Sequence, residues 1–160
     1  MREKTVAEAS PNPKSGKVVS IHRVAVKLGP TEELTAAPFV TNFGLEGDWR
    51  SRKNRGRQIT LIEAEVLTAL ASALKLSAVP SGASRRQVVV QGLILKETLG
   101  KRLRVGPLLV EVHDLCDPCS NMERMIAPGA RALLDLSGGG VCGRVLEGGT
   151  LRPGDEVVVL

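Results

Sequence analysis

Two of the three cysteines in the chain lie only three residues apart, at Cys116 and Cys119. A cysteine acts as a nucleophile or a metal ligand through its thiolate, so its reactivity depends on what lowers its pKa. The apolar residues 108–112 upstream predict a strand, and residues 118–126 downstream predict a short helix. The two cysteines are therefore expected at a strand-to-helix turn, as a site of redox, sulfur or metal chemistry.

The position of Cys119 favours a thiolate. Asp117 is a candidate N-cap and Pro118 suits the first position of a helix, which makes Cys119 the second helical residue. Backbone N–H groups and the positive end of the helix dipole lower the pKa of a thiol there. Asp114 and Asp117 act in the opposite direction, because they bring negative charge close to the sulfur. We therefore expect a modestly activated Cys119.

Length and composition indicate one domain with an aliphatic core. A chain of 160 residues and 17.0 kDa is long enough for one well-buried core and too short for two ordinary domains. Residues 1–17 are rich in Pro, Ser, Glu and Lys without periodicity, so we expect a flexible lead-in followed by one domain over residues 18–160. With two Phe, one Trp and no Tyr, the core has to consist of Val, Leu and Ile.

Composition also restricts the partners and the cellular location. The formal net charge of +5 permits an anionic partner. Nucleic-acid binding is disfavoured, because proteins that hold single strands usually stack the bases on aromatic side chains, which are scarce here. No apolar run approaches the length of a membrane span, and the polar residues 1–16 do not resemble a signal peptide. These features predict a cytoplasmic protein without a membrane partner.

The hydrophobic pattern predicts a mainly β fold with a few helices. One strong helix is expected over residues 61–74, with Thr60 and Glu63 as its capping box. A hairpin is expected at Gly106-Pro107. Seven or eight short strands with few helices indicate a closed or nearly closed β-barrel. The expected strands cover residues 18–26, 37–43, 85–91, 102–105, 108–112, 141–146 and 156–160.

A turn followed by a strongly basic loop is the second candidate site. Gly44 and Gly47 predict a tight turn in which Asp48 caps backbone N–H groups. The loop is either a solvated surface or an anion-binding segment, and the sequence supports the two interpretations equally. Its cations are Arg50, Arg52, Lys53, Arg55 and Arg57.

Six short motifs follow one another in a recognisable order. They are residues 44–48, 57–61, 85–93, 103–106, 116–119 and 145–155. No single motif is specific, but their order resembles the MOSC family, the domain found at the C-terminus of molybdenum cofactor sulfurases and as stand-alone bacterial proteins. The likeness covers about residues 18–158.

The resemblance implies a strand-rich, barrel-like domain that binds molybdenum cofactor or carries sulfur on one cysteine as a persulfide. In the family's cysteine motif the residue after the proline recurs. This implies that Cys119 is the reactive residue and the thiolate ligand to molybdenum, with Cys116 accessory. The basic loop and Arg86 become candidate partners for the phosphate of a pterin cofactor. The implied cofactor-binding residues are Asp48, Arg50, Arg57 and Arg86.

Two departures from the family pattern concern the same region. Many stand-alone members carry histidines after the Gly-Asp turn, where this chain has Trp49 and Arg50, and an asparagine in place of Gln87. No histidine-dependent role is therefore expected at this turn. Pyridoxal phosphate is not expected either, because in full-length sulfurases it belongs to a separate desulfurase domain.

The leading hypothesis is a sulfur-carrier domain in which Cys119 accepts sulfane sulfur and passes it on, or binds molybdenum through its thiolate. Its partner would be a cysteine desulfurase or a molybdoenzyme. One alternative is a molybdenum-cofactor-dependent reductase of N-hydroxylated compounds, and others are a basic nucleic-acid-binding module and a structural zinc site. The zinc ligands would be His113, Cys116, Cys119 and Cys142.

Overall fold

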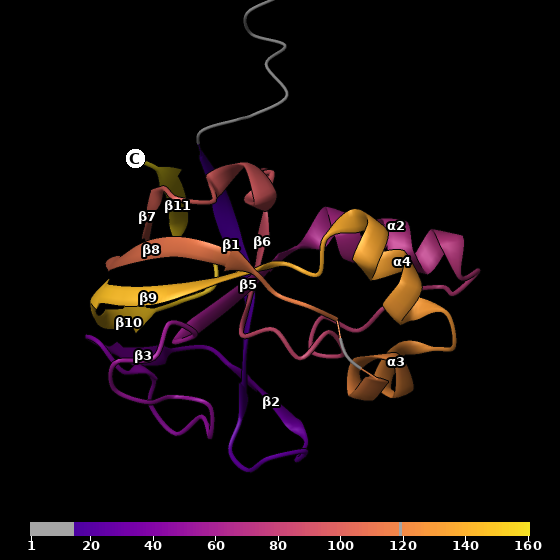
Figure 1. Cartoon of the computed structure of the whole chain (residues 1–160), viewed down its shortest axis with the longest axis horizontal. Helices are drawn as coiled ribbons and strands as arrows, with labels where there is room; N and C mark the ends of the chain where they lie inside the picture. Colours follow the sequence, from indigo (N-terminus) through magenta and orange to yellow (C-terminus); the bar gives the residue numbers. More distant parts are fainter. Residues whose placement is uncertain (1–14, 119) are drawn as a thin grey trace, which may run out of the picture.

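Seven strands close on one another to form a barrel in the computed structural model, which describes residues 15–118 and 120–160 (Figure 1). In order around the ring they are β1 (Ser15–Val24), β6 (Val88–Gln91), β5 (Ile59–Glu63), β9 (Val141–Glu147), β8 (Leu108–Leu115), β7 (Arg102–Val105) and β11 (Glu156–Val159). The pairing of β11 with β1 closes the barrel. All neighbouring strands are antiparallel except β5 and β6, which are parallel.

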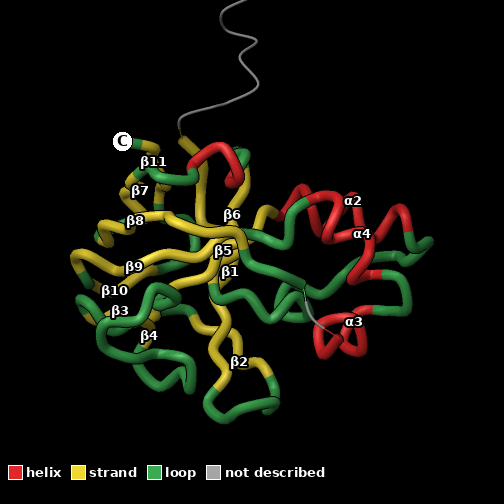
Figure 2. The backbone as a smooth tube through the Cα atoms, in the orientation of Figure 1, coloured by secondary structure: helices red, strands yellow, loops and turns green. Residues whose placement is uncertain are grey.

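The remaining elements surround this barrel, and the three α-helices gather on one side of it (Figure 2). The elements outside the barrel ring are β2 (Thr31–Leu34), β3 (Ala37–Val40), β4 (Gly44–Leu45), α2 (Ala64–Ala73), the 3₁₀ helix η1 (Leu95–Thr98), α3 (Ser120–Ile126), α4 (Ala130–Ser137) and β10 (Gly149–Leu151). β2 extends the barrel sheet beside β1, and β10, β3 and β4 form a small second sheet. Among the described residues no helix has the length and apolarity to cross a membrane. The predicted mainly β fold with a closed barrel is confirmed.

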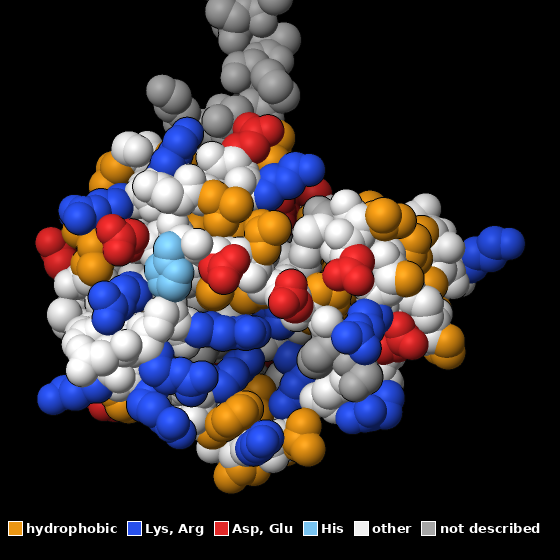
Figure 3. Space-filling model, in the orientation of Figure 1, with side chains coloured by type: hydrophobic (Ala, Val, Ile, Leu, Met, Phe, Trp, Pro, Cys, Tyr) orange, Lys and Arg blue, Asp and Glu red, His pale blue; other side chains and the backbone are white. Residues whose placement is uncertain are grey.

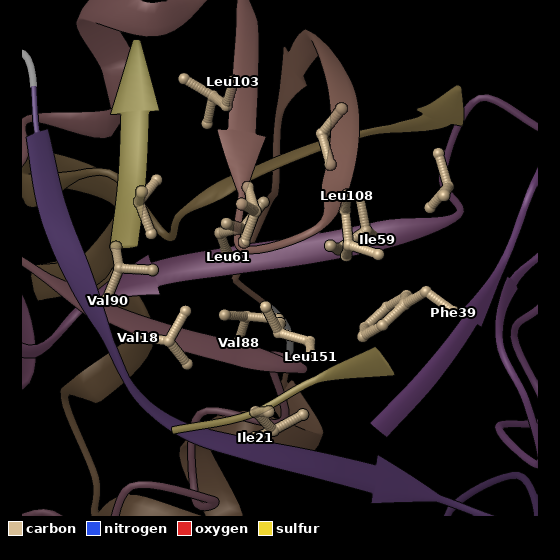
Figure 4. Packing of buried hydrophobic residues seen from close by; sticks show 14 of the residues in the cluster. Val18, Ile21, Phe39, Ile59, Leu61, Val88, Val90, Leu103, Leu108 and Leu151 are labelled. Carbon is tan, nitrogen blue, oxygen red and sulfur yellow. The ribbon is translucent and has the colours of Figure 1, made fainter. Parts of the chain in front are cut away.

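Aliphatic side chains fill the interior of the barrel, with Phe39 among them (Figure 4). β5 shows how the sequence achieves this, because its residues alternate between two apolar environments. Ile59 and Leu61 belong to the cluster inside the barrel, whereas Ile62 joins Val89 in a second cluster beneath the helices. A strand that is apolar on both faces is typical of a sheet covered by helices.

The structure corrects the start of the helix expected over residues 61–74. Residues 61–63 belong to β5, and α2 begins only at Ala64. The expected capping box is absent, because the Thr60 hydroxyl accepts a hydrogen bond from the Gln87 N–H (2.8 Å). The Glu63 carboxylate likewise accepts one from a backbone N–H in η1. An apolar run of this kind fits both the helical and the strand period. Residues 61–63 form a strand because they pair with β6 on one side and β5 pairs with β9 on the other.

The starts of two strands also differ from the expectation, and the strands expected over residues 18–26, 37–43 and 108–112 end at Val24, Val40 and Leu115. β1 begins at Ser15 rather than near residue 18, because residues 15–17 pair with β11. Residues 1–14, the rest of the expected lead-in, lie outside the described residues. β6 begins at Val88, and Arg85 has a left-handed φ of 63°, which interrupts the extended backbone expected from residue 85 onward. The predicted hairpin at residues 106–107 joins β7 to β8.

Candidate functional site

Cys116 and Cys142 touch one another where β8 leaves the barrel and β9 enters it. The strand pairing places Asp114 opposite Cys142, and the Cys116 N–H donates to the Gly140 carbonyl (2.8 Å). The two cysteines therefore lie diagonally across neighbouring strands, on the same face of the sheet. Cys142 is also the neighbour that most strongly lowers the pKa of Cys116. Both thiols are buried and free of disulfide bonds.

This contact makes Cys116 a thiolate at neutral pH. The hydrogen bond from Cys142 lowers the pKa of Cys116 and burial raises it. The guanidinium groups of Arg86, Arg57 and Arg50 lower it further, so that the pKa falls to about 6. The same hydrogen bond, together with burial, raises the pKa of Cys142. The pair therefore carries one negative charge, on Cys116, and one proton, on Cys142.

Alkylation is expected to detect this thiolate. In Cys119→Ser protein, the rate at which iodoacetamide modifies Cys116 should rise with an apparent pKa near 6, because only the thiolate reacts. Adding Cys142→Ala should shift the profile to higher pH, since the hydrogen-bond donor is lost. Mass spectrometry of the modified peptides measures both rates. A profile in Cys119→Ser protein that still rises between pH 8 and 9, as for an ordinary thiol of pKa about 8.5, would contradict the assignment.

Cys119, the cysteine that the sequence singled out, lies outside the described residues, so its role stays a prediction. The helix after it begins at Ser120, and Asp117 and Pro118 precede it without regular structure. The expected helix start at Pro118, with Asp117 as its N-cap, is therefore wrong. A physical reason is that the Asp117 carbonyl, which an N-cap would direct into the helix, accepts a hydrogen bond from Arg86 instead (3.0 Å).

Arg86 holds together the two segments that flank the cysteine contact. Its side chain is nearly completely buried, and its Nε donates to the Gly139 carbonyl (2.7 Å) while its Nη2 donates to Asp117. Position 139 requires glycine, because a Cβ there would lie 2.7 Å from the carbonyl oxygen of Cys116. The guanidinium is thereby fixed close to the Cys116 thiolate, whose charge it stabilises.

Asp48 and Arg50 form a buried ion pair that positions the start of the basic loop. The Asp48 carboxylate is 0% exposed and accepts hydrogen bonds from Nε and Nη2 of Arg50, at 2.9 and 2.8 Å. It also accepts one from the Val24 N–H, and the third Arg50 nitrogen donates to the Arg85 carbonyl (2.7 Å). Burial raises the pKa of Asp48, but the hydrogen bonds and charge of Arg50 outweigh it, and the pKa lies below its usual range. Asp48 therefore acts through Arg50.

A buried glutamine anchors the rest of the basic loop to the barrel. The Gln58 Nε2 donates to the Asn42 side chain (3.1 Å) and to the Arg52 carbonyl (3.2 Å). Its Oε1 accepts a hydrogen bond from the Val145 N–H in β9 (3.1 Å). The Asn42 side chain also binds Asn54 (2.8 Å). The loop is thus tied to β9 and to the turn between β3 and β4, although most of its cationic side chains are exposed.

A pocket of about 310 Å³ lies between the basic loop, the segment before β6 and α3. Figure 3 shows Lys and Arg side chains gathered on this face of the molecule. Six cations and one carboxylate line the pocket, so it attracts anions. Its size falls within the usual range of small-molecule sites, about 300–1,000 Å³. The lining residues are Lys27, Leu28, Trp49, Arg50, Arg55, Arg57, Arg85, Arg86, Asp117 and Asn121.

The pocket contains three of the four cofactor-binding residues that the resemblance implied. Arg50, Arg57 and Arg86 line it, and Asp48 lies behind Arg50. These same three arginines stabilise the Cys116 thiolate, so the pocket and the cysteine contact form one electrostatic unit. Sequence reasoning brought Cys142 to Cys116 only as a ligand of the alternative zinc site. It did not identify their direct interaction, which depends on the pairing of β8 with β9 and leaves no local signal in the sequence.

The described residues give no support to the zinc site. His113 is exposed, and its ring packs on Gly56, where a Cβ would lie 2.6 Å from a ring carbon. Within residues 15–118 and 120–160, no group of three or more His, Cys, Asp and Glu side chains is placed to hold a metal ion. Cys119 lies outside this part of the chain.

The fold and the site define a small β-barrel domain with a buried thiol pair beside an anion-attracting pocket. The model of the MOSC domain matches residues 48–158, more than half of the chain, and the chain therefore belongs to the MOSC domain family. The match covers the basic loop, Arg86 and both cysteines of the pair. This family is associated with the molybdenum cofactor, which places the chain in a molybdenum-cofactor-related class of domains.

Solved structures share the fold at low sequence identity. The YuaD protein from Bacillus subtilis is similar over 91% of this chain and 95% of its own, with a TM-score of 0.77 and 18% identity. YiiM from Escherichia coli is similar over 92% and 70%, with a TM-score of 0.69 and 17% identity. YiiM from Geobacillus stearothermophilus is similar over 91% and 73%, with a TM-score of 0.66 and 18% identity. A comparison with curated proteins finds no match.

Proposed function

We propose that this domain binds the molybdenum cofactor in its arginine-lined pocket and carries sulfane sulfur on its cysteines. The observation that carries this proposal is the juxtaposition of a stabilised thiolate, Cys116, with the arginines of a pocket that attracts anions. A thiolate present at neutral pH is able to accept sulfur or to bind a metal. Family membership supports the identity of the anion.

The residues that line the pocket fit a ligand with a phosphate and a flat ring. The exposed Arg55 and Arg57 suit a phosphate, because one guanidinium group can donate two parallel hydrogen bonds to the phosphate oxygens. Trp49 is 37% exposed and offers a flat apolar surface to a pterin ring. Cys119, with Cys116 as the accessory thiolate, would provide sulfur to the metal. When bound, the molybdenum cofactor supplies a redox-active metal centre.

A cysteine desulfurase is the proposed sulfur donor. The acceptor thiolate attacks the terminal sulfur of the donor's persulfide, a new S–S bond forms on the acceptor, and the donor cysteine leaves as a thiolate. The sulfane sulfur changes carrier without an external oxidant or reductant. Cys119 is the proposed acceptor, as the family resemblance implies. The pocket arginines would stabilise the negative charge of the resulting persulfide.

Intact-protein mass spectrometry tests the sulfur-carrier function. Wild-type protein incubated with a cysteine desulfurase and cysteine should gain one sulfur atom, and dithiothreitol should remove it. Cys119→Ala protein should show no such gain. Molybdenum and pterin are assayed on the same samples. Absence of the gain in wild-type protein would overturn the carrier function, and molybdenum and pterin in these samples would then favour a cofactor-dependent reductase. Equal gains in both proteins would exclude Cys119 as the acceptor.

Arg57 is expected to contribute strongly to anion binding in the pocket. Trp49 is the only tryptophan of the chain and lines the pocket, so its fluorescence reports binding of inorganic pyrophosphate as a probe. Arg57→Ala should weaken this binding about 10- to 100-fold, the usual cost of losing hydrogen bonds to a charged group. Arg52→Ala removes the same charge from the same loop, but at a residue outside the pocket lining, and should have a much smaller effect. Equal weakening by both substitutions would show that the probe responds to the overall positive charge of the loop and not to a specific site in the pocket.

A further inference from the structure

Cys142 has no role in the proposed sulfur transfer, yet the pairing of β8 with β9 makes it the diagonal neighbour of Cys116. Both side chains are buried, at 6% and 2% exposure, and face one another across β8 and β9. Among the cysteines that the structure describes, this is the one thiol beside the Cys116 sulfur. It is therefore able to compete with external thiols for an atom bound to that sulfur.

The surrounding backbone allows the two sulfurs to come closer. Diagonal neighbours across an antiparallel pair have Cα atoms about 7–8 Å apart, somewhat more than a disulfide spans, so a small displacement is needed. β8 ends at Leu115, and residues 116–118 have no regular structure. Gly140 and Gly143 flank the other side of the contact. This segment is held by the Arg86 hydrogen bond to Asp117 and by the Cys116 N–H bond to Gly140. The displacement therefore has to lengthen these two bonds, while the strands of the barrel stay in place.

We infer that Cys142 is the resolving thiol of Cys116, and that the two form a reversible intramolecular disulfide that discharges bound sulfane sulfur as hydrogen sulfide. The Cys116 thiolate first attacks the outer sulfur of the Cys119 persulfide, and the Cys119 thiolate leaves. Cys142 then attacks the inner sulfur of the Cys116 persulfide, the bond to the outer sulfur breaks, and that sulfur takes up the proton of Cys142. One persulfide and one thiol become one disulfide and one H₂S. The sulfane sulfur is reduced, Cys142 is oxidised, and an external thiol reduces the disulfide.

The disulfide is tested first without any sulfur loading, in Cys119→Ser protein treated with oxidised glutathione. Cys116 should attack glutathione disulfide, and Cys142 should then displace the glutathione. The expected product is a peptide linked through Cys116 and Cys142, with no free thiol left. In Cys119→Ser/Cys142→Ser protein, glutathione should remain on Cys116. Circular dichroism establishes that the barrel of each variant is folded. Cys142→Ala serves as a second variant that lacks the thiol.

Either of two results would overturn the inference. Glutathione could persist on Cys116 in the presence of Cys142, or both thiols could remain free while small alkylating reagents still reach them. Both results are read by peptide mass spectrometry and do not depend on sulfur transfer.

The discharge step rests on the proposed sulfur-carrier function and has its own readout. After incubation with a persulfide donor and removal of the excess, wild-type protein should release hydrogen sulfide at least about ten-fold faster than Cys142→Ser protein. Equal rates would overturn the resolving role. A failure of Cys142→Ser protein, which cannot discharge its sulfur in this way, to acquire sulfur would instead overturn the sulfur carrier. The glutathione experiment alone would then decide whether the two cysteines form a disulfide.

Discussion

Replacing Asp48 with alanine is expected to lower the free energy of unfolding by about 3–5 kcal/mol, because it leaves the Arg50 guanidinium without its buried partner. The Asp48 carboxylate is fully buried and the Arg50 side chain is only 16% exposed. Four hydrogen bonds to the carboxylate disappear, two of them from the guanidinium and two from backbone N–H groups. Urea denaturation followed by circular dichroism measures the loss.

The exposed ion pair between Arg104 and Glu147 provides the matched control. Its N–O distance of 3.0 Å is similar, but both side chains are well exposed, at 40% and 60%. Solvent screening reduces the value of such a pair, and Glu147→Ala should cost less than about 1 kcal/mol. A loss of stability in Asp48→Ala protein no larger than that in Glu147→Ala protein would show that the buried pair does not hold this loop.

The contribution of Asp48 to the free energy of unfolding should also depend on pH, and the sign of this dependence follows from its lowered pKa. The pKa of Asp48 is lowered in the folded state, so the unfolded chain binds a proton more readily than the native protein. The stabilisation is therefore complete above the unfolded pKa of about 3.9 and is lost as pH falls through the lower folded pKa. Asp48→Asn protein should be less stable than wild type at pH 6, and the difference should shrink toward pH 3. A constant difference over this range would contradict the lowered pKa.

The pattern of apolar residues was sufficient to predict the barrel, because most of its strands alternate or are bounded by turns. The hairpin at residues 106–107 and the strand beginning at Val141 illustrate this. The same pattern predicted a helix instead of a strand at residues 61–63, because Leu61 faces the barrel interior while Ile62 faces the helices. A strand that is buried on both sides loses its period of two, and only its pairing partners identify it.

The candidate site was predictable only where its residues are neighbours in the sequence. The basic loop and Cys116 were visible as local clusters, and Arg86 was singled out by the family resemblance. The contact of Cys116 with Cys142 depends instead on the register of β8 against β9, which contains an irregularity between Val112 and Asp114. A slip of one residue would turn the side chains after it to the other face of the sheet. The sequence carries no local signal for such a bulge.

Arg86→Ala is the second substitution for which we expect a large effect, because one side chain both joins two segments and stabilises a charge. The side chain is 3% exposed, and its loss removes the donors for the Gly139 and Asp117 carbonyls. Each lost donor to a buried carbonyl costs about 1–3 kcal/mol, so the free energy of unfolding should fall by about 2–5 kcal/mol. The pKa of Cys116 should rise as well, since Arg86 is the first of the three arginines that lower it.

Two further variants separate these two roles of Arg86. Arg86→Lys keeps the positive charge but cannot span both carbonyls, because an ammonium group lacks the planar fork of a guanidinium. It should lose stability while it retains most of the low pKa of Cys116. Arg57→Ala, at an exposed residue, should raise that pKa while stability changes by less than about 0.5 kcal/mol. Urea denaturation and the pH dependence of Cys116 alkylation measure the two effects separately. Should Arg86→Lys behave like wild type in both assays, Arg86 would act by charge alone, and the path of the chain around Cys116 would have to be fixed by Gly139 and the strand pairing.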